Sequence, residues 1–300
     1  MIDINQLSDQ FSIDDHLAFR CNDNGMIAID VDTEHASACI QLQGAHITKW
    51  EIHDQPDIIW LSDDAIFSKG KSIRGGIPVC WPWFGAHKSS TSLPAHGFAR
   101  MVDWELIETR LINESIELVF CLKCSGDLQE MWPFSTELFY TISIGEKLEL
   151  DLHTRNTGAI DINLSEALHS YFNVSDVRDI QLSGLDGCDY LDKLEDFRRK
   201  SQSGVIKINQ EVDRVYLDTV SSCVIDDPGF KRRIMISKQG SKSTIVWNPW
   251  QETASKMGDL GDNGYLNMLC VESGNATENS VVLAPGEDHY LNVEYSVQMN

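Results

Sequence analysis

Short runs in which apolar and polar residues alternate are the feature that most constrains the fold of this chain. In "LELDLHTRN" (148–156) and "HYLNVEYSVQ" (289–298), the apolar side chains recur at every second residue. They therefore fall on one face of an extended strand. Four more runs read as strands: 115–124, 138–145, 231–240 and 243–248. Turn residues such as Asp227-Pro228-Gly229 separate the runs, so the pattern predicts antiparallel strands joined by turns.

Helical periodicity is almost absent. The best stretches are short, at 194–200 and 251–260, and nothing alternates strand and helix as a parallel α/β sheet would. Strand signals continue from about residue 25 to residue 297, without a linker or an internal repeat. We therefore expect an all-β fold: one large antiparallel β-sandwich domain over residues 1–300, with a few short helices. Residues 1–24 are candidates for an N-terminal arm.

The net charge limits the partners. With a formal charge of −22, the chain is poorly suited to nucleic acid or to an anionic membrane surface. No apolar run approaches the roughly 18 residues that a membrane helix needs, and the N-terminus does not resemble a signal peptide. We therefore predict a cytoplasmic protein, with no nucleic-acid or membrane partner.

The eight cysteines form no paired framework. Cys121 and Cys124 are close in sequence, but residues three apart on a strand point to opposite faces, so they make a poor metal clamp. Reduced structural cysteines and no bound metal are therefore expected.

Carboxylates are missing from one segment. Residues 65–102 contain no Asp or Glu, where roughly six would be expected from the average density. The same 38 residues hold five Lys or Arg, among them Arg74 and Arg100, together with His87 and His96. One interpretation is composition noise with solvated lysines. The other is a site for an anionic ligand, because the planar fork of arginine suits phosphate.

Aromatic residues are concentrated in the same segment. "VCWPWFG" contains Trp81, Trp83 and Phe84, whose faces could pack against a sugar ring. The alternative is a buried turn in which these side chains are core.

Three ionisable residues elsewhere are candidates for acid–base chemistry. His169 interrupts the strand-like "SEALHSYF", where a satisfied structural histidine is the common case. Glu272 ends the apolar run "NMLCV" and is therefore expected near the core, where an unpaired carboxylate would be costly. Asp213 stands beside Arg214, with which it could form an exposed ion pair of small value. Spacing alone cannot link residues about a hundred positions apart.

Taken together, six segments resemble the aldose 1-epimerase superfamily and, within it, the hexose-6-phosphate mutarotase (glucose-6-phosphate 1-epimerase) branch. They occur in the family order and span most of the chain: "KSIRGGIPVCWPWFG" (71–85), "PAHGFAR" (94–100), "EALHSYF" (166–172), "DRVY" (213–216), "VWNPW" (246–250) and "VESGN" (271–275). Ser170 stands where threonine would be expected. The resemblance implies a galactose mutarotase-like supersandwich with a sugar cleft on one concave sheet.

The resemblance also implies an acid and a base. His169 matches the family's general acid and Glu272 its general base. Mutarotation would then need no metal or nucleotide cofactor: Glu272 takes the proton from the C1 hydroxyl and His169 protonates the ring oxygen. We expect the nearby carboxylate to raise the pKa of His169 toward neutrality or above.

The remaining matches concern substrate binding. Asp213 resembles a residue that holds sugar hydroxyls, and His96 a second substrate-binding histidine. Arg74 and Arg100 resemble the residues that recognise phosphate. The expected partner is thus a small sugar phosphate, bound by a monomer or weak dimer.

Three alternatives remain open at this point. A mutarotase for neutral aldoses would not need the basic segment. A non-catalytic sugar-phosphate-binding protein would not need both His169 and Glu272. A β-sandwich glycosidase or lyase would need other carboxylate, tyrosine or lysine groups, which sequence cannot rank.

Overall fold

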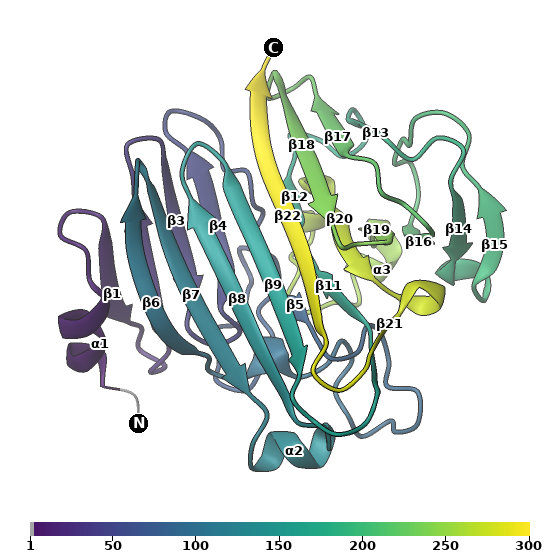
Figure 1. Cartoon of the computed structure of the whole chain (residues 1–300). Coiled ribbons are helices and arrows are strands. Elements are labelled where there is room, and N and C mark those ends of the chain that lie inside the picture. The colour runs from purple at the N-terminus through teal and green to yellow at the C-terminus, as the bar shows by residue number, and fades with distance from the viewer. Residues whose placement is uncertain (1–2) are drawn as a thin grey trace.

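Antiparallel sheets account for most of the molecule. The computed structural model describes residues 3–300, so residues 1–2 of the candidate N-terminal arm lie outside it. Within this range the strands form two eight-stranded sheets, one four-stranded sheet and one two-stranded ribbon (Figure 1). Every pairing between named strands in them is antiparallel, which confirms the expected all-β class.

One eight-stranded sheet, here called the β22 sheet, has the strand order β13-β17-β18-β22-β9-β8-β7-β6. Its strands are β6 (Glu105–Ile112), β7 (Ser115–Lys123), β8 (Thr136–Ile144), β9 (Leu148–Asn156), β13 (Gln181–Ser183), β17 (Cys223–Asp227), β18 (Arg232–Gln239) and β22 (Asp288–Met299). The long alternating runs of the sequence are β7, β8, β9, β18 and β22, so these predicted strands are confirmed.

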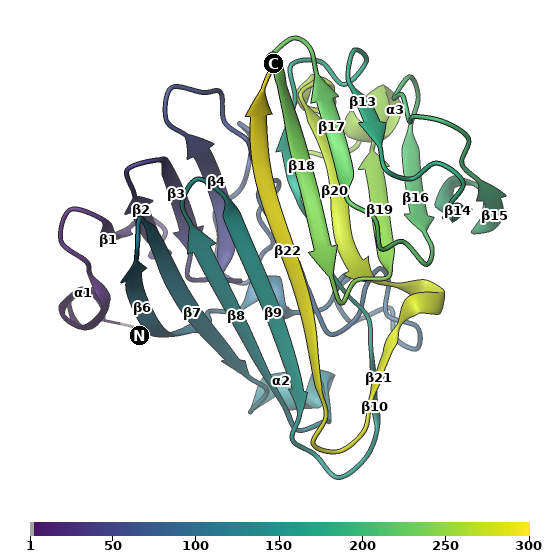
Figure 2. The same cartoon turned by 45° about the horizontal axis from the view of Figure 1, so that its top comes forward.

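The other eight-stranded sheet, here called the β20 sheet, has the order β15-β14-β16-β19-β20-β11-β5, with β12 also paired to β20. Its strands are β5 (Val79–Cys80), β11 (Glu166–Leu168), β12 (Tyr171–Asn173), β14 (Asp189–Asp192), β15 (Arg198–Ser201), β16 (Val212–Tyr216), β19 (Ser243–Asn248) and β20 (Met268–Asn275). Figure 2 shows β20, β19, β16, β14 and β15 following one another toward the right edge of the molecule. Every residue of β20 is buried, as expected for its central place.

The remaining elements are short or peripheral. The four-stranded sheet contains β1 (Leu17–Cys21), β2 (Ile27–Asp32), β3 (Ala36–Gln41) and β4 (His46–Ile52), and the ribbon pairs β10 (Ile162–Leu164) with β21 (Val281–Leu283). The α-helices are α1 (Ile4–Phe11), α2 (Asp127–Met131) and α3 (Trp250–Ala254). Four 3-10 turns complete the described elements: η1 (Ala99–Met101), η2 (Lys193–Glu195), η3 (Gly264–Leu266) and η4 (Thr277–Asn279).

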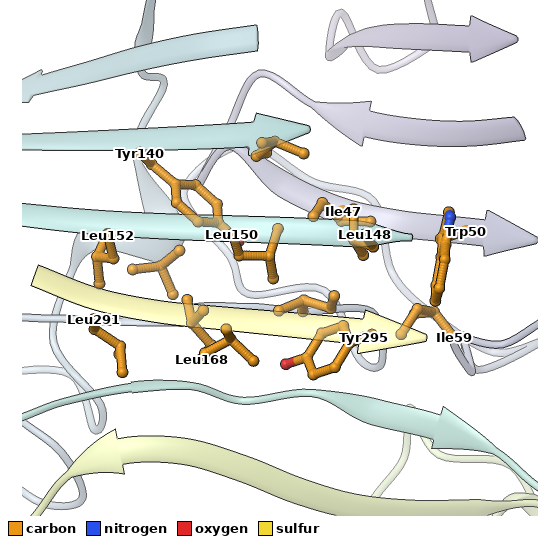
Figure 3. Close-up of a cluster of buried hydrophobic side chains, with 14 of the residues drawn as sticks. Ile47, Trp50, Ile59, Tyr140, Leu148, Leu150, Leu152, Leu168, Leu291 and Tyr295 are labelled. Carbon is orange, nitrogen blue, oxygen red and sulfur yellow. The ribbon is translucent and has the colours of Figure 1, made fainter. Parts of the chain in front are cut away.

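The hydrophobic core lies between the β22 sheet and the layer made by β4 and β11. Leu148, Leu150 and Leu152 of β9 are 2% exposed or less and point toward this layer. Figure 3 shows them among side chains from both layers: Ile47, Trp50 and Leu168 from one, and Tyr140, Leu291 and Tyr295 from the other. The period-2 alternation therefore selects which face of each strand is buried.

Local structure differs from the sequence pattern at residues 194–200. Residues 194–200 are not a helix: η2 ends at Glu195, and Arg198–Ser201 form β15, which pairs with β14. In the candidate N-terminal arm, α1 precedes β1, and β1 pairs with β2 as an edge strand of the four-stranded sheet. None of the described helices is long and apolar enough to cross a membrane.

Candidate active site

A pocket of about 270 Å³ brings together residues that are far apart in the sequence. Its walls come from β12, β16, β19 and β20, from η1 and η2, and from the loops beside them. All six ionisable residues singled out in the sequence line it: Arg74, His96, Arg100, His169, Asp213 and Glu272. Among the three candidate wall aromatics, Phe84 lines it as well.

Strand pairing explains how His169 and Glu272, 103 positions apart, become neighbours. Strand β20 pairs with β11, in the register Leu168↔Ser273, and with β12, in the register Tyr171↔Cys270. His169 lies in the break between β11 and β12, opposite the segment of β20 that carries Glu272. Its backbone N–H donates to the carbonyl oxygen of Pro78 at 3.0 Å, which fixes the break.

The two side chains face each other inside the pocket. His169 Nε2 is 3.4 Å from Glu272 Oε1, and the two residues are 8% and 1% exposed. His169 Nδ1 and Glu272 Oε2 are buried without a hydrogen-bond partner among the described residues. The Tyr171 ring stacks on the imidazole, with centroids 4.8 Å apart and planes 15° apart. Packing against Tyr171 thus holds the imidazole in place, while His169 Nδ1 and Glu272 Oε2 remain without a hydrogen-bond partner.

Burial sets the charge state of this pair. It lowers the pKa of His169 well below its usual value, and the positive charges of Arg100 and Arg74 and the neighbouring His96 lower it further. Burial also raises the pKa of Glu272 well above its usual value. The expectation that the carboxylate raises the pKa of His169 is therefore wrong, because burial lowers this pKa. Desolvation disfavours both charged forms, and it therefore favours a protonated carboxyl group beside a neutral imidazole.

Arg74 owes its position to the glycine pair that follows it. Gly75 and Gly76 have φ of 103° and 72°, and a Cβ at Gly76 would lie 2.4 Å from both His46 Nε2 and the carbonyl oxygen of Ile47. Glycine is required there because a side chain would clash with β4. The "RGG" sequence therefore fixes the backbone that presents Arg74 to the pocket.

The guanidinium of Arg74 has two partners. Its Nε donates to Asp259 Oδ1 at 3.1 Å, and its Nη1 donates to the Tyr171 hydroxyl at 3.2 Å. Asp259 lies in the segment between α3 and η3. Residues 65–102 contain no carboxylate in their own sequence, but in the folded protein the Asp259 carboxylate contacts Arg74.

Arg100 is bound differently. Its Nη2 donates to the carbonyl oxygen of Ala95 at 2.9 Å, while its Nε is buried without a partner. Among residues 3–300, no carboxylate oxygen lies within 4.0 Å of the Arg100 guanidinium nitrogens, whereas Asp259 lies within this distance of Arg74. Arg100 is therefore a cation of the pocket that has no counter-charge in direct contact.

His96 lies beside these cations and is neutral. Burial, followed by the charges of Arg100, Lys193 and Arg74, lowers its pKa to about 3. Its ring packs edge-on against Phe84, with centroids 4.7 Å apart. The backbone N–H of Gly85 donates to its Nδ1 at 3.4 Å, which leaves Nε2 to donate a hydrogen bond.

Asp213 pairs with Lys193, and Arg214 is not its partner. The Lys193 Nζ is 2.6 Å from Asp213 Oδ2, and both side chains are mostly buried. Arg214, the next residue along β16, points to the opposite face and lies over the Tyr190 ring at 4.7 Å. The alternative of an exposed Asp213–Arg214 ion pair is therefore wrong. Burial raises the pKa of Asp213, while Lys193 opposes that rise.

The three candidate wall aromatics divide between pocket and core. Trp81 is fully buried and its Nε1 donates to Thr154 Oγ1 at 3.1 Å. Trp83 is 8% exposed, with its Nε1 donating to the carbonyl oxygen of Pro94. Both belong to the hydrophobic core, whereas Phe84 faces the pocket. Tyr171 and Trp247 add the aromatic surface that sequence reasoning missed.

Lys193 was also missed, for a physical reason. It lies in a charged stretch, "LDKLEDFRRK", where nothing distinguishes one lysine from a solvated neighbour. Its place becomes visible only when η2 turns the chain beside β16. Pairing of β16 with β14 and β19 then sets Asp213 and Lys193 against the same pocket.

Comparison with known proteins places the chain among sugar epimerases. The family model described as aldose 1-epimerase matches residues 28–296. A protein of Escherichia coli K12 named "Putative glucose-6-phosphate 1-epimerase" is 35% identical over 255 residues, which cover 85% of each chain. A protein of the same name from Cenchrus ciliaris is 36% identical over 83% of this chain and 78% of its own.

Solved structures agree on the fold. A crystal structure of a Salmonella typhimurium protein, described as "a putative mutarotase", superposes with a TM-score of 0.90 at 30% identity, covering 99% of both chains. A galactose mutarotase-like protein of Clostridium acetobutylicum superposes with a TM-score of 0.73 at 12% identity, covering 95% of this chain and 98% of its own. At 12% identity, the similarity to the Clostridium protein supports the supersandwich fold and nothing further.

Proposed function

The chain belongs to the aldose 1-epimerase family, whose members are sugar mutarotases, and we propose that it interconverts the α and β anomers of hexose 6-phosphates, chiefly glucose 6-phosphate. One observation carries the proposal. The pocket that holds the His169–Glu272 pair also holds three cationic side chains, those of Arg74, Arg100 and Lys193. The acid–base pair would transfer protons at the anomeric centre, and the cations would bind a phosphate group.

In the proposed reaction the pair shuttles protons between the two oxygens on C1. Glu272 takes the proton of the C1 hydroxyl while His169 gives a proton to the ring oxygen, so the ring opens to an aldehyde. Rotation about the C1–C2 bond then presents the other face of C1. His169 recovers its proton from the C5 hydroxyl as that oxygen attacks, and Glu272 returns its proton to the C1 oxygen.

This chemistry requires one proton on the pair. The neutral arrangement, with a protonated Glu272 and a neutral His169, already contains that proton. Its transfer from Glu272 to His169 Nε2, across the 3.4 Å between them, produces the carboxylate and the imidazolium that the first step needs. Sugar hydroxyls that hydrogen-bond to the charged forms would favour this transfer. Each positioned proton-transfer group typically contributes about 10²–10⁴-fold.

The neutral imidazole of His96 and the carboxylate of Asp213 are proposed to hold sugar hydroxyls. A neutral His96 can donate from Nε2, and Asp213 accepts hydrogen bonds while Lys193 holds it at 2.6 Å. Phe84, Tyr171 and Trp247 would pack against C–H-rich faces of the ring.

Phosphate recognition is proposed for the arginine side of the pocket. Arg100 has an unpartnered Nε and no contacting carboxylate, so an anion would gain a charge-assisted hydrogen bond there. The names of the E. coli and Cenchrus relatives point to the same substrate class. A mutarotase for neutral aldoses would leave this charge unused.

An anomer assay tests the proposal. Crystalline α-anomer of glucose 6-phosphate is dissolved with the protein, and its anomeric proton signals are followed by NMR against a buffer control, then with glucose and galactose. We expect a much larger acceleration for glucose 6-phosphate than for either neutral sugar. Equal acceleration of all three would favour the neutral-aldose alternative, and no acceleration would favour a non-catalytic binding protein.

A further inference from the structure

Arg74 is already bound to an anion of the protein itself. The Asp259 carboxylate is 3.1 Å from its Nε, and the two side chains are 26% and 24% exposed. The contact joins segments 185 residues apart, at the side of the pocket where Met257 forms part of the wall. A carboxylate of the protein itself thus contacts the arginine that the proposed function assigns to phosphate.

The two arginines therefore differ in what an incoming phosphate meets. Arg100 has no carboxylate in contact within residues 3–300, and its Nε has no partner. A phosphate can bind Arg100 directly. At Arg74 it meets the Asp259 carboxylate on the same guanidinium, and like charges so close together repel each other strongly.

We propose that Asp259 is a specificity-determining residue that competes with the substrate phosphate for Arg74, so that a phosphate binds fully only by displacing this carboxylate. The inference rests on the proposed function, because it needs a phosphate at that side of the pocket. A dianionic phosphate held by Arg100 and Arg74 together outcompetes a single carboxylate. A neutral hexose leaves the Arg74–Asp259 pair intact.

Local structure allows the displacement. The side chain of Asp259 makes one hydrogen bond, to Arg74, and is already partly exposed. The next residue, Leu260, is 1% exposed and anchors the loop in a hydrophobic cluster with Trp60 and Tyr265. The backbone can therefore stay in place while the carboxylate rotates into solvent.

The same loop offers a matched control. Asp262 is exposed and forms no ion pair with Arg74, yet it carries the same charge three residues further on. Asp259→Asn and Asp262→Asn remove the same charge from the loop, but only the first breaks the contact. A difference between them isolates the competition from long-range electrostatic attraction.

Two measurements test the proposal. In Asp259→Asn we expect the KM for glucose 6-phosphate, relative to that for free glucose, to fall about twofold to fivefold, as for loss of a partly exposed ion pair. Calorimetric titration with inorganic phosphate should give a Kd lowered by the same factor. Asp262→Asn should change both quantities less than twofold, and Asp259→Ser repeats the test if the asparagine variant folds poorly.

Two results would overturn the proposal. A higher Kd for inorganic phosphate in Asp259→Asn would mean that Asp259 positions Arg74 instead of competing for it. Equal effects of both asparagine variants would mean that only net charge matters. The phosphate titration needs no turnover. If the wild type showed no preference for glucose 6-phosphate but Asp259→Asn still bound phosphate more tightly, the proposed function would fail and the competition would stand.

Discussion

Two histidine–glutamate pairs, each with a buried glutamate, lie on neighbouring strands of this molecule, but their surroundings differ. One is His169–Glu272, in the pocket. The other is His289–Glu166, where His289 Nε2 of β22 is 2.8 Å from Glu166 Oε1 of β11. The glutamates belong to adjacent strands of the β20 sheet, β20 and β11, and each is 1% exposed or less.

The pair at His289 joins the two large sheets. Asn275, the cross-strand partner of Glu166, also donates to Glu166 Oε1 at 3.2 Å and to the carbonyl oxygen of Gly240 at 2.8 Å. The contact is short and supported by an amide, although Glu166 Oε2 has no partner. This geometry holds strands together and leaves no room for a ligand between the groups.

The pair at His169 has a longer separation, 3.4 Å, and faces open volume. Nearby positive charges, including Arg74 and Arg100, act on the imidazole and help to keep it neutral. A buried histidine–glutamate contact is therefore not by itself a sign of catalysis. At the other pair only His289 lines a groove, and Glu166 does not. What distinguishes the pair at His169 is that both members line one pocket together with Arg74, Arg100 and Lys193.

The largest expected effect comes from His169→Asn. Loss of one positioned proton-transfer group should lower kcat/KM about 10²–10⁴-fold. The thermal midpoint should change little, because the contact that is lost, at 3.4 Å, is longer than an ordinary hydrogen bond. Anomer interconversion by NMR and a thermal melt measure the two quantities. Near-normal interconversion by this variant would refute the acid assignment.

His289→Asn should show the opposite pattern. Removing one partner of a buried pair costs about 3 kcal/mol of the free energy of unfolding, because Glu166 then stays buried with Asn275 as its remaining donor. Urea titration measures this loss. The kcat of the folded fraction should stay within twofold of the wild type, and a large drop in kcat would mean that the two pairs are not functionally separate.

Arg74→Ala should act on substrate choice. Loss of its charge-assisted hydrogen bonds should reduce kcat/KM for glucose 6-phosphate about 10–100-fold more than for free glucose. Lys69→Ala, a charge-matched control in the same basic segment but outside the pocket lining, should leave the ratio unchanged. Equal losses of both sugars in Arg74→Ala would argue against phosphate recognition at this residue.

The strands were predictable because alternation and turn residues are local signals, as β9 and β22 illustrate. Glu272 was predictable as a near-core carboxylate because it ends an apolar run. The strand at residues 198–201 could not be predicted, because its sequence pattern resembles that of a helix and its extended structure comes from pairing with β14. Lys193 reaches the pocket, and Asp259 reaches Arg74, through tertiary contacts that leave no mark on the nearby sequence.

The smallest expected effect is a shift in pH dependence. The neutral pair gains a second proton only below the lowered pKa of His169 and loses its last proton only above the raised pKa of Glu272. The one-proton state therefore spans a pH range that begins below the usual pKa of histidine and ends above the usual pKa of glutamate, and kcat/KM should be flat within it. Arg100 is one of the charges that lower the pKa of His169.

Arg100→Gln should therefore raise the pKa of His169 and move the acid limb of kcat/KM to higher pH, by less than about one unit, as expected for one partly screened charge. Free glucose is the substrate to use, because a phosphate group titrates near pH 6 itself. An acid limb that moves to lower pH, or that also moves in Lys69→Ala, would contradict a local effect of Arg100 on the pocket pair. The same variant should leave the stability contributed by His289–Glu166 unchanged, because Arg100 forms no contact with either residue.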